Sequence, residues 1–394
     1  MFDLRRWVGG FLPLAVLCIS ACVAPPPPAP PAESKHQTVR GAARVAAVEL
    51  SQQLAHGGKP KGAIWISPAV NRQSGEVTVS GKELQVLLAL DLKSTLPDAV
   101  VHSLGADPDA IWSWIMTPVV EFEKPTSDDL TTNWFVVRLN ATRADGYVLP
   151  QKILRINAQH FDATPSKFYV DAPIYLTRVT ESDRNDLRSD GAAKVSDPVV
   201  LRRLASIESL TQKGIIEFEE GRAQESLEFF NRALKLDPGN LTALFGTYQS
   251  WQSLGNTANA DAAFVALIDA AVAQGNISFR FLFQLRLSEF RNDMQISRQY
   301  DYWLRHMADR LHAAGRCLLI KGHASRSGSM EYNDRLSLDR ARQIGAQLLR
   351  YVPALKGKIR MEGLGFRNNL VGSGTDDAKD AVDRRVDFKL IPCS

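Results

Sequence analysis

The sequence has 394 residues, which is enough for two or three domains with cores of their own. Its 45% of hydrophobic and 23% of charged residues are ordinary for a globular protein. The formal net charge of +4 is too small to indicate nucleic acid, and no basic patch with interleaved aromatic residues appears. We therefore expect a multidomain globular protein with no nucleic-acid partner.

The N-terminus has the features of an export signal. Arg5 and Arg6 precede an apolar run of about 13 residues, which is too short for the ~20 that a membrane span needs. The run ends in the sequence ISAC at residues 19–22, which resembles the bacterial lipobox. This resemblance implies that residues 1–21 are cut off and that the thiol of Cys22 carries lipid. The alternative is an ordinary signal peptide with a chance cysteine.

The residues after the cysteine point to a tether. In lipoproteins of this kind, an Asp directly after the lipidated cysteine favours the inner membrane. This chain has Val23 there, so the resemblance implies the outer membrane, with the protein facing the periplasm. Proline in the segment APPPPAPPAES lacks a backbone N–H and fixes φ, which excludes helix and sheet. Residues 22–37 are thus predicted to be the lipidated cysteine and a polyproline spacer with a reach of roughly 30 Å.

The cysteines suggest one disulfide. Cys18 would leave with the signal and Cys22 would carry lipid, so Cys317 and Cys393 remain in an oxidising compartment. A bridge between them would close a loop of about 76 residues and contribute roughly 4.5 kcal/mol in the chain-entropy model. The alternative is a pair of buried free thiols.

Residues 38–180 are predicted to form an α+β domain, because helical spacing is followed by short apolar strands and by an Asp-Gly hairpin signal at residues 145–146. Four tryptophans in this domain either form a ligand surface or belong to its core and rim. The polar segment 181–198 reads as a linker. The expected elements are a helix over 39–54, strands over 63–67 and 76–80, and a hairpin of strands over 133–142 and 147–158. The tryptophans are Trp65, Trp112, Trp114 and Trp134.

Residues 199–275 are predicted to be helical and resemble two tetratricopeptide repeats. With a period of 34, small and aromatic residues fall where the repeat needs them, although Ser226 and Val272 depart from the pattern. Two repeats are fewer than the roughly three that a solenoid needs, so they would lean on a neighbouring domain. They could offer a partner groove or act only as a spacer. The matching residues are Gly214, Gly221, Phe230, Ala233 and Pro238, then Gly255, Ala260 and Phe264.

Residues 276–394 alternate between strand and helix patterns. The predicted order βαβαββ gives a sheet packed by helices on one side. The whole chain is thus expected to be a multidomain α+β protein. The expected elements of the last domain are strands over 279–285, 317–323, 358–365 and 384–391, and helices over 297–315 and 334–352.

The segment from Gly322 to Ala341 is similar to the OmpA-like peptidoglycan-binding domain, whose core reads G-H-T-D-x-x-G-x-x-x-Y-N-x-x-L-S-x-x-R-A. Later matches are a G-x-G turn at Gly363 and Gly365 and the Asp-Arg-Arg-Val strand entry at 383–386. The matches to the core are Gly322, His323, Gly328, Tyr332, Asn333, Leu336, Ser337, Arg340 and Ala341.

The resemblance implies that the pocket binds the diaminopimelate of the peptidoglycan stem. In the family the loop Asp takes the ammonium and the helix Arg takes the carboxylate, which a guanidinium fork matches and lysine cannot copy. Arg340 is then the carboxylate clamp, and Asn333 and Ser337 brace the loop. His323 is either a packed loop residue or a ligand, and one of Arg384 and Arg385 is expected to brace the pocket. The predicted binding residues are Gly322, His323, Ala324, Ser325, Asn333, Leu336, Ser337, Arg340 and Arg385.

The chain departs from the family at Ala324-Ser325, where the motif has Thr-Asp. A hydroxyl can accept from an ammonium without charge assistance, so we expect a loss of roughly 1–2 kcal/mol, or about 5–30-fold in affinity. We expect peptidoglycan contact to be retained, because tethering raises the local concentration of the wall. The alternative is a domain kept only as a structural or docking module.

The sequence contains no recognised catalytic arrangement. The seven histidines lack metal-ligand spacing, and neither a G-x-S-x-G elbow nor a phosphate-binding loop with its lysine occurs. We predict no enzyme activity, metal or cofactor. The expected function is that of an outer-membrane lipoprotein that binds peptidoglycan and scaffolds envelope proteins. The alternative is a docking component of an envelope secretion or pilus machine.

Overall fold

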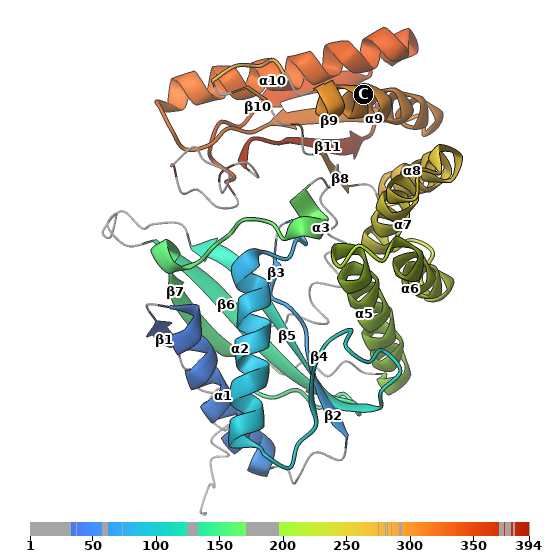
Figure 1. The fold of residues 1–394 in the computed structure, drawn as a ribbon. Helices are drawn as coiled ribbons and strands as arrows, with labels where there is room; N and C mark the ends of the chain where they lie inside the picture. The colour runs from blue at the N-terminus through green and yellow to red at the C-terminus, as the bar shows by residue number, and fades with distance from the viewer. Residues whose placement is uncertain are drawn as a thin grey trace, which may run out of the picture. The chain divides into compact units, whose positions relative to one another are not determined.

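The computed structural model describes most of the chain after the predicted tether (Figure 1). The predicted signal, Cys22, residues 23–32 of the tether and the linker up to residue 196 lie outside the described residues. The domain boundaries therefore stay predictions. The described residues are 33–36, 38–56, 62–72, 74–123, 133–170, 197–274, 276–279, 281, 283–284, 286–290, 294–369, 374, 380 and 383–393.

The end of the predicted tether, Glu33–His36, forms a strand that pairs in parallel with residues 153–156. The prediction that the segment excludes sheet is therefore wrong for Glu33 and Ser34, which follow the last proline and keep their N–H groups.

The first region, residues 33–170, is built on a seven-stranded sheet with the order β1-β7-β6-β5-β2-β4, in which β3 pairs with β5. Strands β5, β6 and β7 are antiparallel, whereas β2 pairs in parallel with both β4 and β5. The strands are β1 Glu33–His36, β2 Ala63–Ile66, β3 Val70–Asn71, β4 Val101–Ser103, β5 Trp112–Glu123, β6 Trp134–Arg143 and β7 Lys152–Asn157.

Two helices, α1 (Val39–His56) and α2 (Val79–Thr95), bury their apolar faces in one core with the sheet (Figure 1). Small alanines of α1 and leucines of α2 meet strand residues such as Ile64 and Val137, all of them nearly inaccessible to water. A short helix, α3 (Lys167–Val170), ends the region as described.

The predicted helix at 39–54, the strand at 63–67 and the hairpin are confirmed. The predicted strand at 76–80 is wrong, because helix α2 begins at Val79. Thr78 is its N-cap, and the Thr78 Oγ1 accepts a hydrogen bond from the Gly81 N–H at 3.1 Å. A hydroxyl in that position satisfies an unpaired N–H of the first turn and outweighs the β preference of the Val-Thr-Val sequence.

The tryptophans belong to the core rather than to a ligand surface. Trp65, Trp112 and Trp114 are buried, and Trp134 is half-buried with Lys35 over its ring. Trp65 and Trp112 share a small core with Leu201 and Ala205 of the following helical region. The alternative of an exposed aromatic surface is therefore wrong for the three buried rings.

The second region consists of four helices in which each packs on the next: α5 (Pro198–Glu219), α6 (Ala223–Leu236), α7 (Leu241–Ser253) and α8 (Thr257–Ala273). Phe230 fills the space between helices, and a Cβ at Gly214 or Gly246 would lie 2.6 or 2.2 Å from its ring. Gly214 and Phe230 thus pack as expected, whereas a Cβ at Gly221 or Gly255 would meet no atom within 4 Å. The assignment of these helices to tetratricopeptide repeats stays a prediction.

The third region has the predicted order βαβαββ, with a four-stranded sheet of order β10-β9-β11-β8. Buried residues of the sheet, such as Ile320 and Phe388, pack with Leu304 of α9 and with Ile344 of α10, which runs along the sheet in Figure 1. The predicted first strand at 279–285 lies earlier, at Asn276–Phe279. The elements are β8 Asn276–Phe279, α9 Met294–Ala313, β9 Cys317–Gly322, α10 Met330–Tyr351, β10 Ile359–Gly363 and β11 Val386–Ile391.

Two further findings concern the predictions from the N-terminus and the cysteines. Cys317 and Cys393 form a disulfide, with Cα atoms 5.0 Å apart, which ties β9 to the end of the chain. No helix among the described residues has the length and apolar character needed to cross a bilayer.

Candidate functional site

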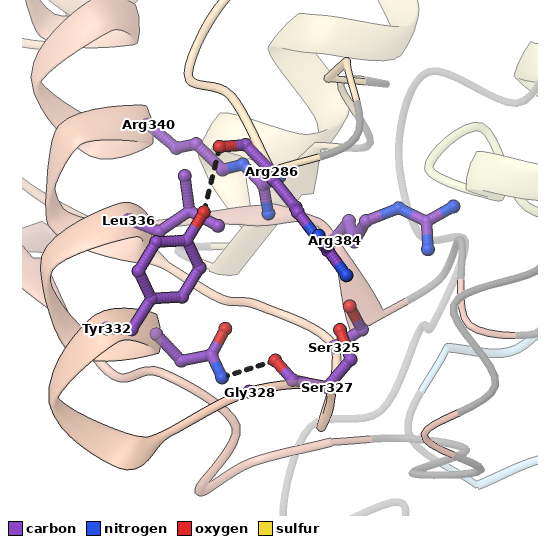
Figure 2. Close-up of a pocket in the computed structure, with 9 residues that line it drawn as sticks. Arg286, Ser325, Ser327, Gly328, Tyr332, Leu336, Arg340 and Arg384 are labelled. Atoms are coloured by element: carbon purple, nitrogen blue, oxygen red, sulfur yellow. Dashed lines mark hydrogen bonds between the residues drawn. The ribbon is translucent and has the colours of Figure 1, made fainter.

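A cavity of about 290 Å³ opens in the third region, where the start of α10 meets the loop after β9 (Figure 2). Side chains from several segments face it, and the Tyr332, Leu336 and Arg340 side chains come from one helix. The lining residues are Arg286, Ser325, Ser327, Gly328, Tyr332, Asn333, Leu336, Arg340 and Arg384.

Local capping fixes the start of α10. The Ser329 hydroxyl accepts from the Tyr332 N–H at 3.2 Å, and the Asn333 Nδ2 donates to the Ser327 and Ser329 carbonyls at 2.8 and 3.1 Å. Gly328 has a φ of +92°, which a residue with a Cβ rarely adopts. The predicted bracing role of Asn333 fits these bonds. Residues 332, 336 and 340 are spaced by four and thus share one face of the helix.

Arg340 lies at the floor of the cavity and is only 1% exposed. Its Nε donates to the Leu287 carbonyl at 3.2 Å, and its guanidinium lies 4.9 Å from the centre of the Phe283 ring. A buried guanidinium needs such partners, since an unpaired charge in this position would be costly. The contacts hold the fork in one orientation toward the cavity.

A hairpin before α9 covers this arginine. Phe283 and Phe290 form an isolated antiparallel bridge, and the Gln284 N–H donates to the Glu289 carbonyl at 2.8 Å. At its tip, Arg286 has a φ of +60°, and the Arg286 carbonyl accepts from the Tyr332 hydroxyl at 3.0 Å. The hairpin is thereby tied to α10 and brings Arg286 to the cavity.

Behind the cavity, the backbone of β9 lies very close to α10. A Cβ at Gly322 would lie 1.8 Å from the Ser337 carbonyl oxygen, so no larger residue fits there. The Ser337 hydroxyl donates to the Asp334 carbonyl at 3.0 Å and accepts from the Gly365 N–H at 2.9 Å. Gly322 and Ser337 therefore hold the loop and the G-x-G turn in place.

Part of the chain is similar to known proteins. Residues 291–383 match the model of the OmpA family. Three similar solved structures are the peptidoglycan-associated lipoprotein from Burkholderia pseudomallei, the cell wall anchor of the T6SS from Pseudomonas aeruginosa and the periplasmic domain of Helicobacter pylori MotB. The comparison with curated protein sequences gave no match.

The likeness to each solved structure covers about a third of this chain. The B. pseudomallei protein is 24% identical over 30% of this chain and 92% of its own, with a TM-score of 0.24. The P. aeruginosa protein is 22% identical over 33% of this chain and 96% of its own, with a TM-score of 0.26. MotB is 11% identical over 30% of this chain and 76% of its own, with a TM-score of 0.24.

The OmpA-family domain places four of the predicted residues on the cavity: Ser325, Asn333, Leu336 and Arg340. The other five lie outside its lining. The Ala324 side chain is buried, and the Ala324 N–H donates to the Gly365 carbonyl at 2.9 Å. The remaining predicted residues, Gly322, His323, Ser337 and Arg385, are buried around the loop.

His323 is a packed loop residue rather than a lining one. It is 1% exposed, and its Nε2 lies 2.8 Å from an oxygen of Asp387. Burial lowers the pKa of His323 below its usual value; the nearby Arg385 guanidinium acts in the same direction, and Asp387 opposes both. The imidazole is therefore neutral at pH 7.

Arg384, rather than the predicted Arg385, lines the cavity. Arg385 is buried, with its Nε 3.1 Å from Asp387 and its Nη2 donating to the Asn368 carbonyl at 3.1 Å. Side chains alternate along an extended chain, so the residue that pairs with Asp387, two positions on, points away from the cavity. Arg385 thus braces the loop, and Arg384 lines the cavity.

Sequence reasoning also missed Arg286. It lies before the matched residues 291–383 and belongs to no motif of the family core. A cluster of at least three His, Cys, Asp or Glu side chains that could hold a metal does not occur among the described residues.

Proposed function

We propose that this protein is an outer-membrane lipoprotein that binds peptidoglycan non-covalently through its OmpA-family domain. The observation that carries the proposal is the buried Arg340, held by the Leu287 carbonyl and Phe283 at the floor of a cavity that Ser325 also lines. The resemblance of the sequence gives this arginine the role of carboxylate clamp. The position that the family gives to the ammonium-binding Asp carries Ser325.

The geometry supports this role in two ways. A guanidinium can hold a carboxylate through two parallel hydrogen bonds, and a fork already fixed by neighbouring groups loses little conformational entropy on binding. The cavity is also partly dry, since Ser325 and Asn333 are nearly inaccessible to water, so the charge interaction is screened less than on an open surface.

The proposed anchor lies outside the described residues. Cys22 with its lipid would fix the chain to the inner leaflet of the outer membrane, and the proline-rich spacer would let the OmpA-family domain reach the wall. Two-dimensional confinement raises the effective concentration of the ligand, so a weak single contact can still tie membrane to wall.

A scaffolding role for the other regions is part of the proposal. The interior of the helical region contains Phe168 of the preceding region, which lies 5.3 Å from Phe245 and 5.9 Å from Phe230 between ring centres. A protein partner would therefore bind an outer face of these helices rather than this interior. The docking role in a secretion or pilus machine, the alternative from the sequence, uses the same faces.

The test is co-sedimentation of the full chain with purified peptidoglycan sacculi. Arg340→Ala is expected to leave the protein in the supernatant, while Arg342→Ala sediments as wild type. Arg342 is the matched control because it lies on the same helix, is exposed and pairs with Asp339 at 3.0 Å. Since Arg340 is buried, circular dichroism must show that its variant is folded. As a second measurement, soluble muropeptides should release the wild-type protein from sacculi; the absence of both effects would overturn the proposal.

A further inference from the structure

The lining of the cavity is strongly cationic. Of the nine described residues that line it, three are arginines and none is acidic. Two of the three, Arg286 and Arg384, lie outside residues 291–383, which match the family. Arg384 belongs to the Asp-Arg-Arg-Val match, whereas Arg286 adds a positive charge that no part of the family motif contains.

Two aspartates on the elements around the cavity are paired with arginines outside its lining. Asp387 lies against His323 and Arg385, and Asp334 is paired with Arg367. Neither aspartate lines the cavity. The polar side chains that line the cavity are these guanidinium groups, the hydroxyls of Ser325, Ser327 and Tyr332, and the amide of Asn333. None of them carries a negative charge.

Arg286 is held in position by its own backbone. The left-handed φ of +60° is uncommon for a residue other than glycine, and the bond from the Tyr332 hydroxyl to the Arg286 carbonyl fixes the turn against α10. In Figure 2 the Arg286 side chain extends across the lining residues toward Ser325. A cation thus reaches the side of the cavity where the family motif has a carboxylate.

This arrangement changes which form of diaminopimelate fits. A free ammonium is repelled by nearby guanidinium groups, and the Ser325 hydroxyl, which accepts without charge assistance, offsets less of that repulsion than a carboxylate would. When the same amine is acylated by a cross-link to a neighbouring stem, it becomes a neutral amide N–H. One hydroxyl oxygen satisfies an amide N–H, and the added carboxylates of the second stem suit the second guanidinium.

We propose that this cavity selects cross-linked peptidoglycan stems, whose diaminopimelate amine is acylated, over stems with a free amine. The inference rests on the proposed function and refines its ligand. Arg340 holds the diaminopimelate carboxylate, Ser325 accepts from the amide, and Arg286 acts as a specificity-determining residue that binds a second carboxylate and repels ammonium.

The test is calorimetric titration of the full chain with three soluble ligands: a disaccharide-tetrapeptide with its free amine, the same compound N-acetylated on diaminopimelate, and the cross-linked dimer. Wild type should bind the acetylated compound and the dimer about 5–30-fold more tightly than the free amine. The preference should shrink as salt is raised, because Arg286 is exposed.

Two variants sharpen the result. Ser325→Asp should reverse the preference toward the free amine. Arg286→Asn, chosen because Asn tolerates left-handed backbone, should reduce the preference, while the control Arg342→Ala leaves it unchanged.

The outcomes separate this inference from the proposed function. If wild type binds the free amine as tightly as the acetylated compound, or more tightly, the selectivity is refuted and the proposed function stands. If wild type and Ser325→Asp bind none of the three ligands, the proposed function fails together with the inference.

Discussion

The interior of the helical region and the cavity of the OmpA-family domain differ in what fills them. In the helical region, glycines at 214 and 246 make room for Phe230, and Phe168 from the sheet region packs against the same aromatic cluster. The Glu219 side chain holds that segment by accepting from the Phe168 N–H at 3.1 Å and from the Ser166 hydroxyl at 3.2 Å. The OmpA-family cavity instead retains about 290 Å³ of space lined by charge.

This difference separates an internal packing contact between two regions from the proposed binding site. An interior filled by apolar rings of the same chain gains free energy from burial and offers no room for a ligand. A cavity that keeps a buried guanidinium has paired it with carbonyls and an aromatic ring, and its remaining space suits an anion. The comparison predicts that substitutions in the first place change stability, whereas those in the second change binding.

The largest expected effect comes from the disulfide of the OmpA-family domain. Replacing both Cys317 and Cys393 with serine should lower the free energy of unfolding by about 4.5 kcal/mol, because the unfolded chain regains the entropy of a loop of 76 residues. Denaturant unfolding of the oxidised, reduced and double-serine proteins measures it. Equal midpoints for all three would contradict the prediction.

The next effect concerns the packing of Phe168 into the helical region. Phe168→Ala should cost about 4 kcal/mol, because a fully buried ring is removed from a cluster that can collapse only partly. Val199→Ala is the control, since its side chain is 67% exposed. Peptidoglycan binding of the folded fraction should be unchanged. A cost below about 1 kcal/mol would show that Phe168 does not stabilise the contact between the sheet region and the helices.

A smaller effect is expected where the hairpin meets α10. Tyr332→Phe removes the hydroxyl that donates to the Arg286 carbonyl, which should cost about 1 kcal/mol of stability or less at this half-exposed site. The affinity for the cross-linked dimer should fall several-fold, because Arg286, which binds the second carboxylate in the proposed complex, is no longer fixed. Unchanged affinity at unchanged folding would argue against a role for the hairpin in binding.

The smallest effect concerns pH. Burial lowers the pKa of His323, so the folded state binds fewer protons than the unfolded state once the pH falls below the ordinary value of 6.5. Stability should therefore be constant above that pH and decline below it. His323→Gln should flatten this decline between pH 7 and roughly 5 in thermal unfolding. Parallel curves for the two proteins would refute the assignment.

The sequence allowed prediction where spacing alone decides position. The motif on α10 put residues 333, 336 and 340 near one another because a helix has a fixed period, and the structure places all three on the cavity. The hairpin at residues 145–146 was equally local. Such predictions need no knowledge of distant contacts.

The sequence did not allow prediction where two local structures compete for the same residues, or where a contact with a distant residue sets the position of a side chain. Thr78 could extend a strand or cap a helix, and the hydrogen bond to Gly81 decided for the cap. Arg385 and Arg384 could not be told apart before the pairing with Asp387 was known. Arg286 reaches the cavity only because its hairpin folds back on Tyr332, 46 residues later in the chain.

The most direct test of the central claim is the affinity of the full chain for a soluble diaminopimelate muropeptide, compared between wild type, Arg340→Lys and Arg342→Ala. Lysine keeps the charge but cannot supply the fork, so the account predicts a loss of more than about ten-fold for Arg340→Lys and none for Arg342→Ala. Equal affinity of all three folded proteins would contradict it.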